Sequence, residues 1–320
     1  MNRSRVVVVI AALLVVGVGI VVATRPASHP ASHPTTKGAC GVVASGPTYK
    51  HVVVIVEENH SYGSIIGSGS APYVNSLAAS CGLATNYHNV THFSLPNYLA
   101  MTSGMSLSDL APFYNDCLPA ASCVTSASSI FTQTFAKSYQ ESMPSNCDTS
   151  IAGSSYVPKH NPDVYYSDAN CATRDVPFSA GSTGLIADFQ TQATAPSFAF
   201  VTPNLCNDTH DCSVSSGDAW LQANLAALLA SPVYLSGDTA VFLVWDEGEP
   251  GSAGMDCASN TSDQSCHVAL LVIAPSVNPG TQVATLFNHY SLLRTVEQLL
   301  GLSYLGQAQS ATSMVQAFNL

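Results

Sequence analysis

The chain has 320 residues, of which 47% are hydrophobic and only 9% are charged. Nine Lys and Arg face twenty Asp and Glu, so the formal net charge is −11. This balance excludes a basic surface for nucleic acid or for an anionic membrane, and the length allows one large α/β domain.

The N-terminus has the pattern of an export segment. Residues 1–24 contain Arg3 and Arg5, followed by an apolar run over 6–23. This pattern is typical of a secretion signal or of an uncleaved membrane tether, and both place the rest of the chain outside the cytoplasm. Residues 25–47 are rich in Pro, Ser and His, and we expect them to form an extended linker before a catalytic domain at 48–320.

Ten cysteines follow the apolar run, and export makes them candidates for disulfides. Three pairs lie close in sequence, and two more would complete five bridges. The pairs are Cys117/Cys123, Cys206/Cys212, Cys257/Cys266, Cys147/Cys171 and Cys40/Cys81.

The first predicted strand covers residues 51–56, a short β-branched apolar run typical of a buried parallel strand. Glu58 and Asn59 follow it directly. A carboxylate and an amide are oxygen ligands for a divalent cation, although solvation of a strand end is the alternative.

A hydroxyl stands at the start of the next helix. Ser94 precedes Pro96 in the stretch 91–104, which predicts Ser94 as the N-cap of a buried helix. A hydroxyl among the unpaired N–H groups of a helix start can attack and hold a phosphate. Asn97 is then a candidate donor to a phosphate oxygen, and His92 lies two residues before the serine.

Residues 105–180 are rich in Ser, Asn and Cys and show little periodicity, so we expect a disulfide-tied insertion or cap over the site. Lys159 and His160 lie within it. A cation and an imidazole suit the oxygens of a phosphate, whereas a turn ending at Pro162 is the simpler alternative.

A second strand is predicted over 197–201, and Asp208, His210 and Asp211 follow it. A histidine can protonate a leaving oxygen while a neighbouring aspartate holds its tautomer. A helix with Asp218 as its cap follows this cluster.

A third strand at 240–245 ends in Asp246 and Glu247. Two adjacent carboxylates behind a buried strand are costly unless a cation or hydrogen-bond donors compensate them. A fourth strand is predicted over 268–273, and a helix over 290–300 with His289 at its start.

This alternation of strands and helices predicts a mostly parallel sheet with helices on both faces. Ligands bind such sheets at the carboxyl ends of the strands, where the acids and histidines are expected. A nucleophilic hydroxyl, acidic metal ligands and histidines together suit metal-assisted phosphoryl transfer.

The motifs in this order resemble the bacterial phosphoesterase family of the alkaline-phosphatase-like superfamily. The resemblance is strongest to the secreted acid phosphatase branch, which includes phosphatidylinositol-3-phosphate phosphatases. The matching segments are VVVIVEENHS, THFSLPNYLAMTSG, YVPKHNP, FAFVTPNLCNDTHDCSVSSGDAWL, VFLVWDEGE and NHYSLLRTVEQLLGL.

The resemblance implies an α/β/α sandwich and one divalent metal ion. It implies Ser94 as the nucleophile, which also touches the metal, and His210 with Asp208 or Asp211 in protonation of the leaving group. The implied metal ligands are Glu58, Asn59, Asp246 and Glu247, and the implied phosphate neighbours are His92, Lys159, His160, His210 and His289.

The expected function is therefore an exported, monomeric phosphomonoesterase of the acid phosphatase type, with a phosphoseryl intermediate. Its substrate would be a small phosphomonoester or a phospholipid headgroup. Two alternatives stay open: a phospholipase C-like diesterase with the same site, and an inactive, envelope-tethered binding protein.

Overall fold

The computed structural model describes residues 38–168, 170–180, 183–249 and 256–320. The expected signal or anchor at 1–24 and the first part of the linker lie outside the described residues. In the part of the chain that is described, no helix has the length and apolar character needed to cross a membrane.

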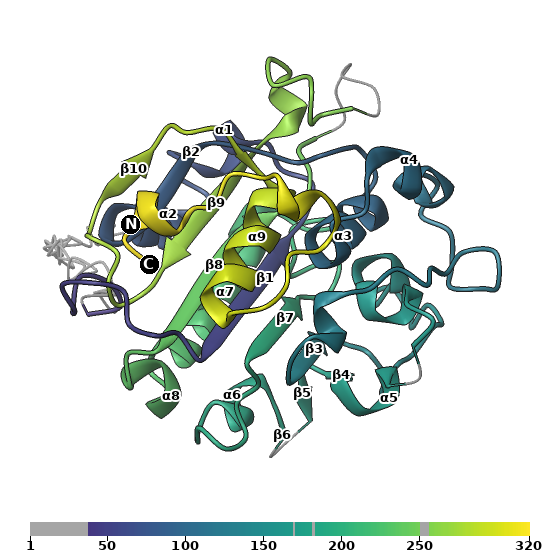
Figure 1. Cartoon of the computed structure of the whole chain (residues 1–320), viewed down its shortest axis with the longest axis horizontal. Coiled ribbons are helices and arrows are strands. Elements are labelled where there is room, and N and C mark those ends of the chain that lie inside the picture. The colour runs from purple at the N-terminus through teal and green to yellow at the C-terminus, as the bar shows by residue number, and fades with distance from the viewer. Residues whose placement is uncertain (1–37, 169, 181–182, 250–255) are drawn as a thin grey trace, which may run out of the picture. The chain divides into compact units, whose positions relative to one another are not determined.

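A mixed sheet of nine strands organises the described chain (Figure 1). The strands follow the order β10-β2-β9-β8-β1-β7-β3-β4, and β11 also pairs with β2. Their bounds are β1 (His51–Glu57), β2 (Gly82–His88), β3 (Ala136–Gln140), β4 (Asp175–Pro177), β7 (Phe198–Thr202), β8 (Thr239–Trp245), β9 (His267–Ile273), β10 (Thr281–Val283) and β11 (Phe287–Asn288). Two short strands, β5 (Ser179–Ala180) and β6 (Thr183–Gly184), pair separately.

Strand β1 lies in the middle of the sheet, parallel to β7 on one side and to β8 on the other. All seven of its residues are buried. A central parallel strand is covered by helices on both faces, which explains why its sequence is a continuous β-branched run. The prediction of this strand is confirmed.

Strand β9 differs from its prediction, because it runs antiparallel to both β8 and β2. An apolar run reports burial on both faces but carries no information about strand direction. The chain therefore reverses between β8 and β9, and the end of β9 lies at the opposite edge from the end of β8.

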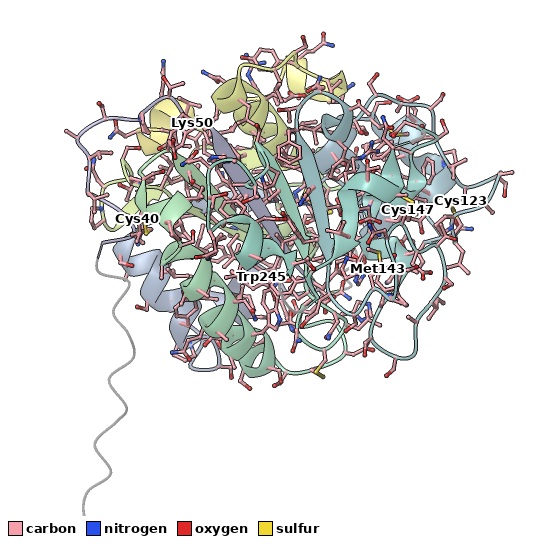
Figure 2. All side chains as sticks on the ribbon, turned by 90° about the horizontal axis from the view of Figure 1, so that it is seen from below. Cys40, Lys50, Cys123, Met143, Cys147 and Trp245 are labelled. Carbon is pink, nitrogen blue, oxygen red and sulfur yellow. A yellow bond between two sulfur atoms is a disulfide. The ribbon has the colours of Figure 1, made fainter. Side chains whose placement is uncertain are left out.

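Helices cover both faces of the sheet, as the predicted α/β/α sandwich requires (Figures 1 and 2). Helices α3 and α9 lie together on one face, and α2 and α7 lie together on the other. The helix bounds are α1 (Tyr62–Ile65), α2 (Pro72–Ser80), α3 (Ser94–Ser103), α4 (Leu107–Leu110), α5 (Cys171–Arg174), α6 (Leu185–Asp188), α7 (Val214–Leu229), α8 (Pro232–Leu235), α9 (His289–Leu300) and α10 (Val315–Phe318).

The helix ends follow the sequence in one case and depart from it in another. Helix α9 begins after Asn288, whose side chain accepts two backbone N–H groups, and ends at Gly301 with a positive φ of 67°. Helix α7 begins before Asp218, so the predicted cap was wrong. The Asp218 carboxylate instead accepts the N–H groups of Tyr73 and Val74 at the start of α2.

The stretch 105–180 is less separate than expected, because β3 and β4 belong to the main sheet. Strand β3 escaped prediction since it buries polar side chains and has no apolar run. Ser138 and Gln140 are both buried, and the Gln140 amide donates to the Ser138 hydroxyl at 2.9 Å. Loops, short helices and two disulfides make up the rest of the stretch.

All five expected disulfides are present in the structure. Figure 2 shows Cys123 and Cys147 at one side of the view and Cys40 at the other. The bridges therefore fasten loops around the sheet rather than cross-link one region.

Candidate active site

The predicted site residues converge at the carboxyl ends of β1, β7 and β8. Backbone hydrogen bonds join the three loops there: the N–H of Glu58 donates to the carbonyl of Asp208 at 2.7 Å, and that of Asp246 donates to Glu57 at 2.9 Å. The three central parallel strands thus deliver their polar loops to one place, as the rule for parallel sheets requires.

Ser94 is the first residue of α3, and it is not the N-cap. Phe93 occupies the cap position with φ 68°, and no side-chain capping bond is made there. The Ser94 hydroxyl donates instead to Glu58 Oε2 at 3.1 Å. The helix start therefore holds the hydroxyl against a buried acid, and the capping prediction was wrong.

Asn97 closes the turn before the helix, and this explains why a serine cap is not needed. Its Oδ1 accepts the N–H groups of Val90 and Thr91 at 3.2 Å, and its Nδ2 donates to the carbonyls of Thr91 and Phe93 at 2.8 and 3.1 Å. Both amide hydrogens are used and the side chain is fully buried, so this geometry does not support the predicted contact with phosphate.

Two buried acids form the floor of the site. Glu58 Oε1 accepts the hydroxyl of Tyr98 at 2.5 Å, whereas Asp246 Oδ1 accepts the N–H groups of Asn59 and Glu247 at 3.2 and 2.6 Å. Burial, and then the charge of Asp246, raises the pKa of Glu58 well above its usual value. Burial, and then the charge of Glu247, raises the pKa of Asp246.

Asp246 Oδ2 is buried and has no hydrogen-bond partner among the described residues. A free carboxylate oxygen beside a second buried acid is costly unless a cation compensates it. Oxygen donors of this kind are the ligands that hard divalent cations prefer. The residues present therefore fit the divalent metal ion that the sequence resemblance implies.

Asn59 and Glu247 flank this floor. Asn59 has φ 56°, which turns the backbone so that its N–H meets Asp246. Glu247 Oε2 lies 2.8 Å from Nδ1 of His92, and His92 Nε2 lies 3.1 Å from the hydroxyl of Ser265. His92, which lies two residues before Ser94 in sequence, therefore holds the Glu247 carboxylate in place.

His160 lies beneath the acids and is nearly fully buried. Its Nε2 is 3.3 Å from Glu58 Oε2, its Nδ1 is 3.2 Å from Asp208 Oδ2, and its ring stacks on Tyr98. Burial, and then the charge of Lys159, lowers the pKa of His160 well below its usual value. The ring therefore lies between Glu58 and Asp208, and its Nε2 makes no hydrogen bond within the described residues.

The predicted His–Asp pair forms with the later of the two aspartates. His210 Nδ1 lies 2.7 Å from Asp211 Oδ1, whereas Asp208 accepts only the backbone N–H of His210, at 2.8 Å. Asp208 therefore shapes the loop, and Asp211 sets the tautomer of the His210 ring. The His210 Nε2 faces Lys159 Nζ at 3.3 Å.

His289 does not reach the site. Its Nε2 donates to the carbonyl of Asp246 at 2.6 Å, and its Nδ1 accepts the hydroxyl of Tyr87 at 2.9 Å. Burial lowers the pKa of His289 to about 4, against the effect of the bond to Asp246. Both ring nitrogens are engaged in hydrogen bonds, so this geometry does not support the predicted contact with phosphate.

Asp116 is a site residue that the sequence analysis missed. Its Oδ2 lies 3.2 Å from Lys159 Nζ, and its Oδ1 accepts the N–H of Leu95 at 3.0 Å. Burial opposes the charge on Lys159, but Glu58 and Asp116 outweigh it and raise the pKa of the lysine. An aspartate in an aperiodic loop gives no sequence signal beyond its place directly before Cys117.

A second group of metal-competent atoms overlaps the first. Ligand atoms of Glu58, His160 and His210 all lie within 4.8 Å of one another. Nitrogen and oxygen donors in this arrangement suit zinc or another transition metal. The site thus has carboxylates on one side of Glu58 and imidazoles on the other.

The fold is similar to that of an alkaline phosphatase superfamily protein and of a pyrophosphatase/phosphodiesterase. An alkaline phosphatase superfamily protein from Vibrio parahaemolyticus matches with a TM-score of 0.58 at 13% identity, covering 85% of this chain and 72% of that one. Murine ectonucleotide pyrophosphatase/phosphodiesterase 5 matches with a TM-score of 0.55 at 10% identity, covering 80% and 96%. These likenesses show the fold alone.

Sequence comparison narrows the class. The Phosphoesterase family model matches residues 68–303, and the chain belongs to this family. The phosphatidylinositol-3-phosphatase of Mycobacterium tuberculosis is 34% identical over 276 residues, covering 85% of this chain and 84% of that protein. An acid phosphatase of Aspergillus fumigatus is 30% identical over 250 residues, covering 75% of this chain and 53% of that protein. The protein is a phosphoesterase, a hydrolase of phosphoric esters.

Proposed function

We propose that the protein is an exported, metal-dependent phosphomonoesterase in which Ser94 is the nucleophile. One observation carries this proposal: the Ser94 hydroxyl lies 3.1 Å from Glu58 Oε2, beside Asp246, whose buried Oδ2 has no hydrogen-bond partner among the described residues. Five disulfides support export, because such bonds persist in oxidising compartments.

The metal ion would be held by Glu58, Asn59, Asp246 and Glu247, with Ser94 beside it. When bound, it would neutralise charge on the phosphate and favour the deprotonated serine. Since Glu58 Oε2 already accepts the Ser94 hydrogen bond, the hydroxyl is oriented toward the proposed metal ligands before substrate arrives.

Two transfers complete the reaction. The Ser94 oxygen forms a bond to phosphorus while the bond to the leaving alcohol breaks, which gives a phosphoseryl intermediate. Water then cleaves that intermediate and releases inorganic phosphate. In the first transfer the Ser94 hydroxyl loses its proton and the leaving alcohol oxygen gains one; in the second, water loses a proton and the Ser94 oxygen gains one. We assign these proton transfers to His210, whose Nδ1 lies 2.7 Å from Asp211 Oδ1.

Lys159 would supply a positive charge to the phosphate, and its Nζ lies 3.2 Å from Asp116 Oδ2. Asp116 Oδ1 also accepts the N–H of Leu95 at the start of α3. Because Asp116 contacts both Lys159 and the backbone next to Ser94, it fixes the ammonium group relative to the serine. His92 acts through Glu247, which it holds at 2.8 Å. Asp208 and His160 support Glu58 from below.

The substrate class follows from the relatives. A phosphomonoester of a small molecule or of a phospholipid headgroup fits both the acid phosphatase and the phosphatidylinositol-3-phosphatase names. We propose the domain organisation 1–24, 25–47 and 48–320, with a tether through 6–23 if the signal is not cleaved. N-terminal sequencing of the exported protein tests the last point.

The direct test is hydrolysis of p-nitrophenyl phosphate between about pH 5 and 8, after EDTA treatment and after metal add-back. We expect activity to vanish with EDTA and return with one metal, and an acid quench to trap phosphate on the Ser94 peptide. Activity that survives chelation by EDTA would overturn the proposed dependence on a metal ion. Release of diacylglycerol from phosphatidylcholine at a higher kcat/KM than hydrolysis of the monoester would favour a phospholipase C-like diesterase. Inactivity after metal repletion would favour an inactive binding protein.

A further inference from the structure

Phe93, directly before Ser94, has a backbone conformation that is unfavourable for its residue type. Its φ is 68° and its ψ is 142°. Positive φ is rare for a bulky side chain, and this part of the map is populated almost only by glycine. The conformation is enforced, since the Phe93 carbonyl accepts a hydrogen bond from the buried Asn97 amide at 3.1 Å.

The side chain of Phe93 is also costly where it lies. It is 47% exposed, although the neighbouring Ser94 is buried and α3 is buried over its whole length. The ring is absent from the hydrophobic core and from the ring contacts of the described residues. Packing therefore does not repay the exposure of this apolar surface.

Neither cost is needed to form the turn. A glycine at this position would adopt the same φ without strain and would expose no apolar surface. A strained residue whose side chain points out beside a nucleophile is a sign of function, because strain of this kind persists where it is used. The ring is thus the feature that requires an explanation.

We propose that Phe93 is a specificity-determining residue that contacts the leaving alcohol of the substrate, and that it favours alcohols with an apolar surface next to the ester oxygen. This inference rests on Ser94 being the nucleophile, as proposed above. The Ser94 hydroxyl faces inward to Glu58. A phosphate that reaches this hydroxyl from the solvent side would be displaced in line, which points its leaving group back toward solvent. The exposed side chain of Phe93 is one residue away from Ser94.

The test compares two primary alkyl phosphates, hexyl phosphate and glycerol 1-phosphate, in wild type and Phe93→Ala with the metal-loaded, full-length protein. Both leaving groups are primary alcohols, so the chemistry is matched. We expect kcat/KM for hexyl phosphate to fall about tenfold, mainly through KM, and kcat/KM for glycerol 1-phosphate to change less than about threefold. Phe93→Leu should restore most of the hexyl phosphate activity.

Phe135→Ala is the matched control, because Phe135 is similarly exposed (53%) and lies at the amino end of β3, away from the site. It should change neither substrate. An equal loss for both substrates in Phe93→Ala would overturn the inference, since the ring would then only position Ser94. Phe93→Gly, which removes ring and strain together, decides the matter if the alanine variant does not fold. A wild type inactive on both substrates would instead refute the proposed function.

Discussion

Polar side chains are buried at both ends of strand β1, but within the described chain only those at the amino end have all their hydrogen-bond partners. At the amino end His51 is buried, and its two ring nitrogens lie 2.9 Å from the carbonyl of Pro196 and 2.7 Å from Gln192 Oε1. At the carboxyl end Glu58 faces Asp246, a second buried acid, and one oxygen of Asp246 has no partner among the described residues.

The difference separates polar groups that the fold satisfies from polar groups left for a ligand. A buried polar group with partners is stabilising or neutral, whereas an unpaired buried carboxylate destabilises the fold. A protein tolerates such a cost at a site where something else binds. We therefore expect substitutions at the carboxyl end of β1 to alter activity, and substitutions at the amino end to alter stability.

The largest effect should come from Ser94→Ala. Loss of the attacking oxygen should reduce kcat by several orders of magnitude, on the order of 10³ or more. The variant should unfold at nearly the same temperature as wild type, because the only side-chain hydrogen bond it loses within the described residues is the one from Ser94 to Glu58. Steady-state hydrolysis of p-nitrophenyl phosphate with circular dichroism checks both. Undiminished turnover would rule out the proposed mechanism.

Asp246→Asn should reduce activity by about 100-fold or more and make the Tm less sensitive to metal. Without metal, the variant should be more stable than wild type, since the charge repulsion of Asp246 with Glu58 and Glu247 is removed. Thermal unfolding with and without EDTA measures this. A metal-free variant that is less stable than metal-free wild type would contradict the interpretation of the carboxyl end.

Asp116→Asn should affect binding more than chemistry. The amide keeps the shape of Asp116 but weakens the ion pair with Lys159, so the inhibition constant of inorganic phosphate and KM should rise about fivefold to tenfold. The value of kcat should fall less than about threefold. Tighter phosphate binding in the variant would show instead that Asp116 competes with phosphate for Lys159 and the N–H of Leu95.

At the amino end, His51→Leu should destabilise the protein by about 2 kcal/mol, because the carbonyl of Pro196 would stay buried without its donor. The kcat/KM at 25 °C should stay within about twofold of wild type, and metal should stabilise the variant as much as wild type. Urea unfolding and a standard assay measure these quantities. A large loss of activity in folded protein would break the contrast between the two ends.

The smallest effect on activity should come from Glu297, a buried acid on α9 away from both ends. Its Oε2 has no hydrogen-bond partner among the described residues. Burial raises the pKa of Glu297 to about 7, although its Oε1 accepts the N–H of Leu305. The folded state therefore holds the proton up to a higher pH than the unfolded state, and stability falls as pH rises from about 4.5 to about 7. Glu297→Gln should flatten this fall, measured as Tm at pH 5 and pH 8, and leave activity unchanged. An unchanged slope would show that Glu297 is not responsible.

The sequence predicted the parts of the fold that depend on a continuous apolar run. Strands β1 and β8 were found from such runs, and α9 from its periodicity and Gly301. Strand β3 was missed because Ser138 and Gln140 satisfy each other inside the sheet, and the direction of β9 was missed because burial has no direction.

For the site, the sequence predicted which loops meet but not how each side chain is used. Glu58, Asp246 and Ser94 lie together as expected, since strand ends determine where they lie. Asn97 and His289 are occupied by backbone carbonyls, and only coordinates reveal such partners. Asp116 was missed because it comes from a loop without periodicity.

The central position of β1 has a consequence for how the protein assembles. Its neighbours β7 and β8 follow about 150 and 190 residues later in the chain, so β1 cannot pair until most of the polypeptide has emerged. Glu58 therefore meets Asp246 only in a nearly complete molecule. Hydrolytic competence is therefore gained late in folding, and an incomplete chain would stay inert toward phosphate esters around it.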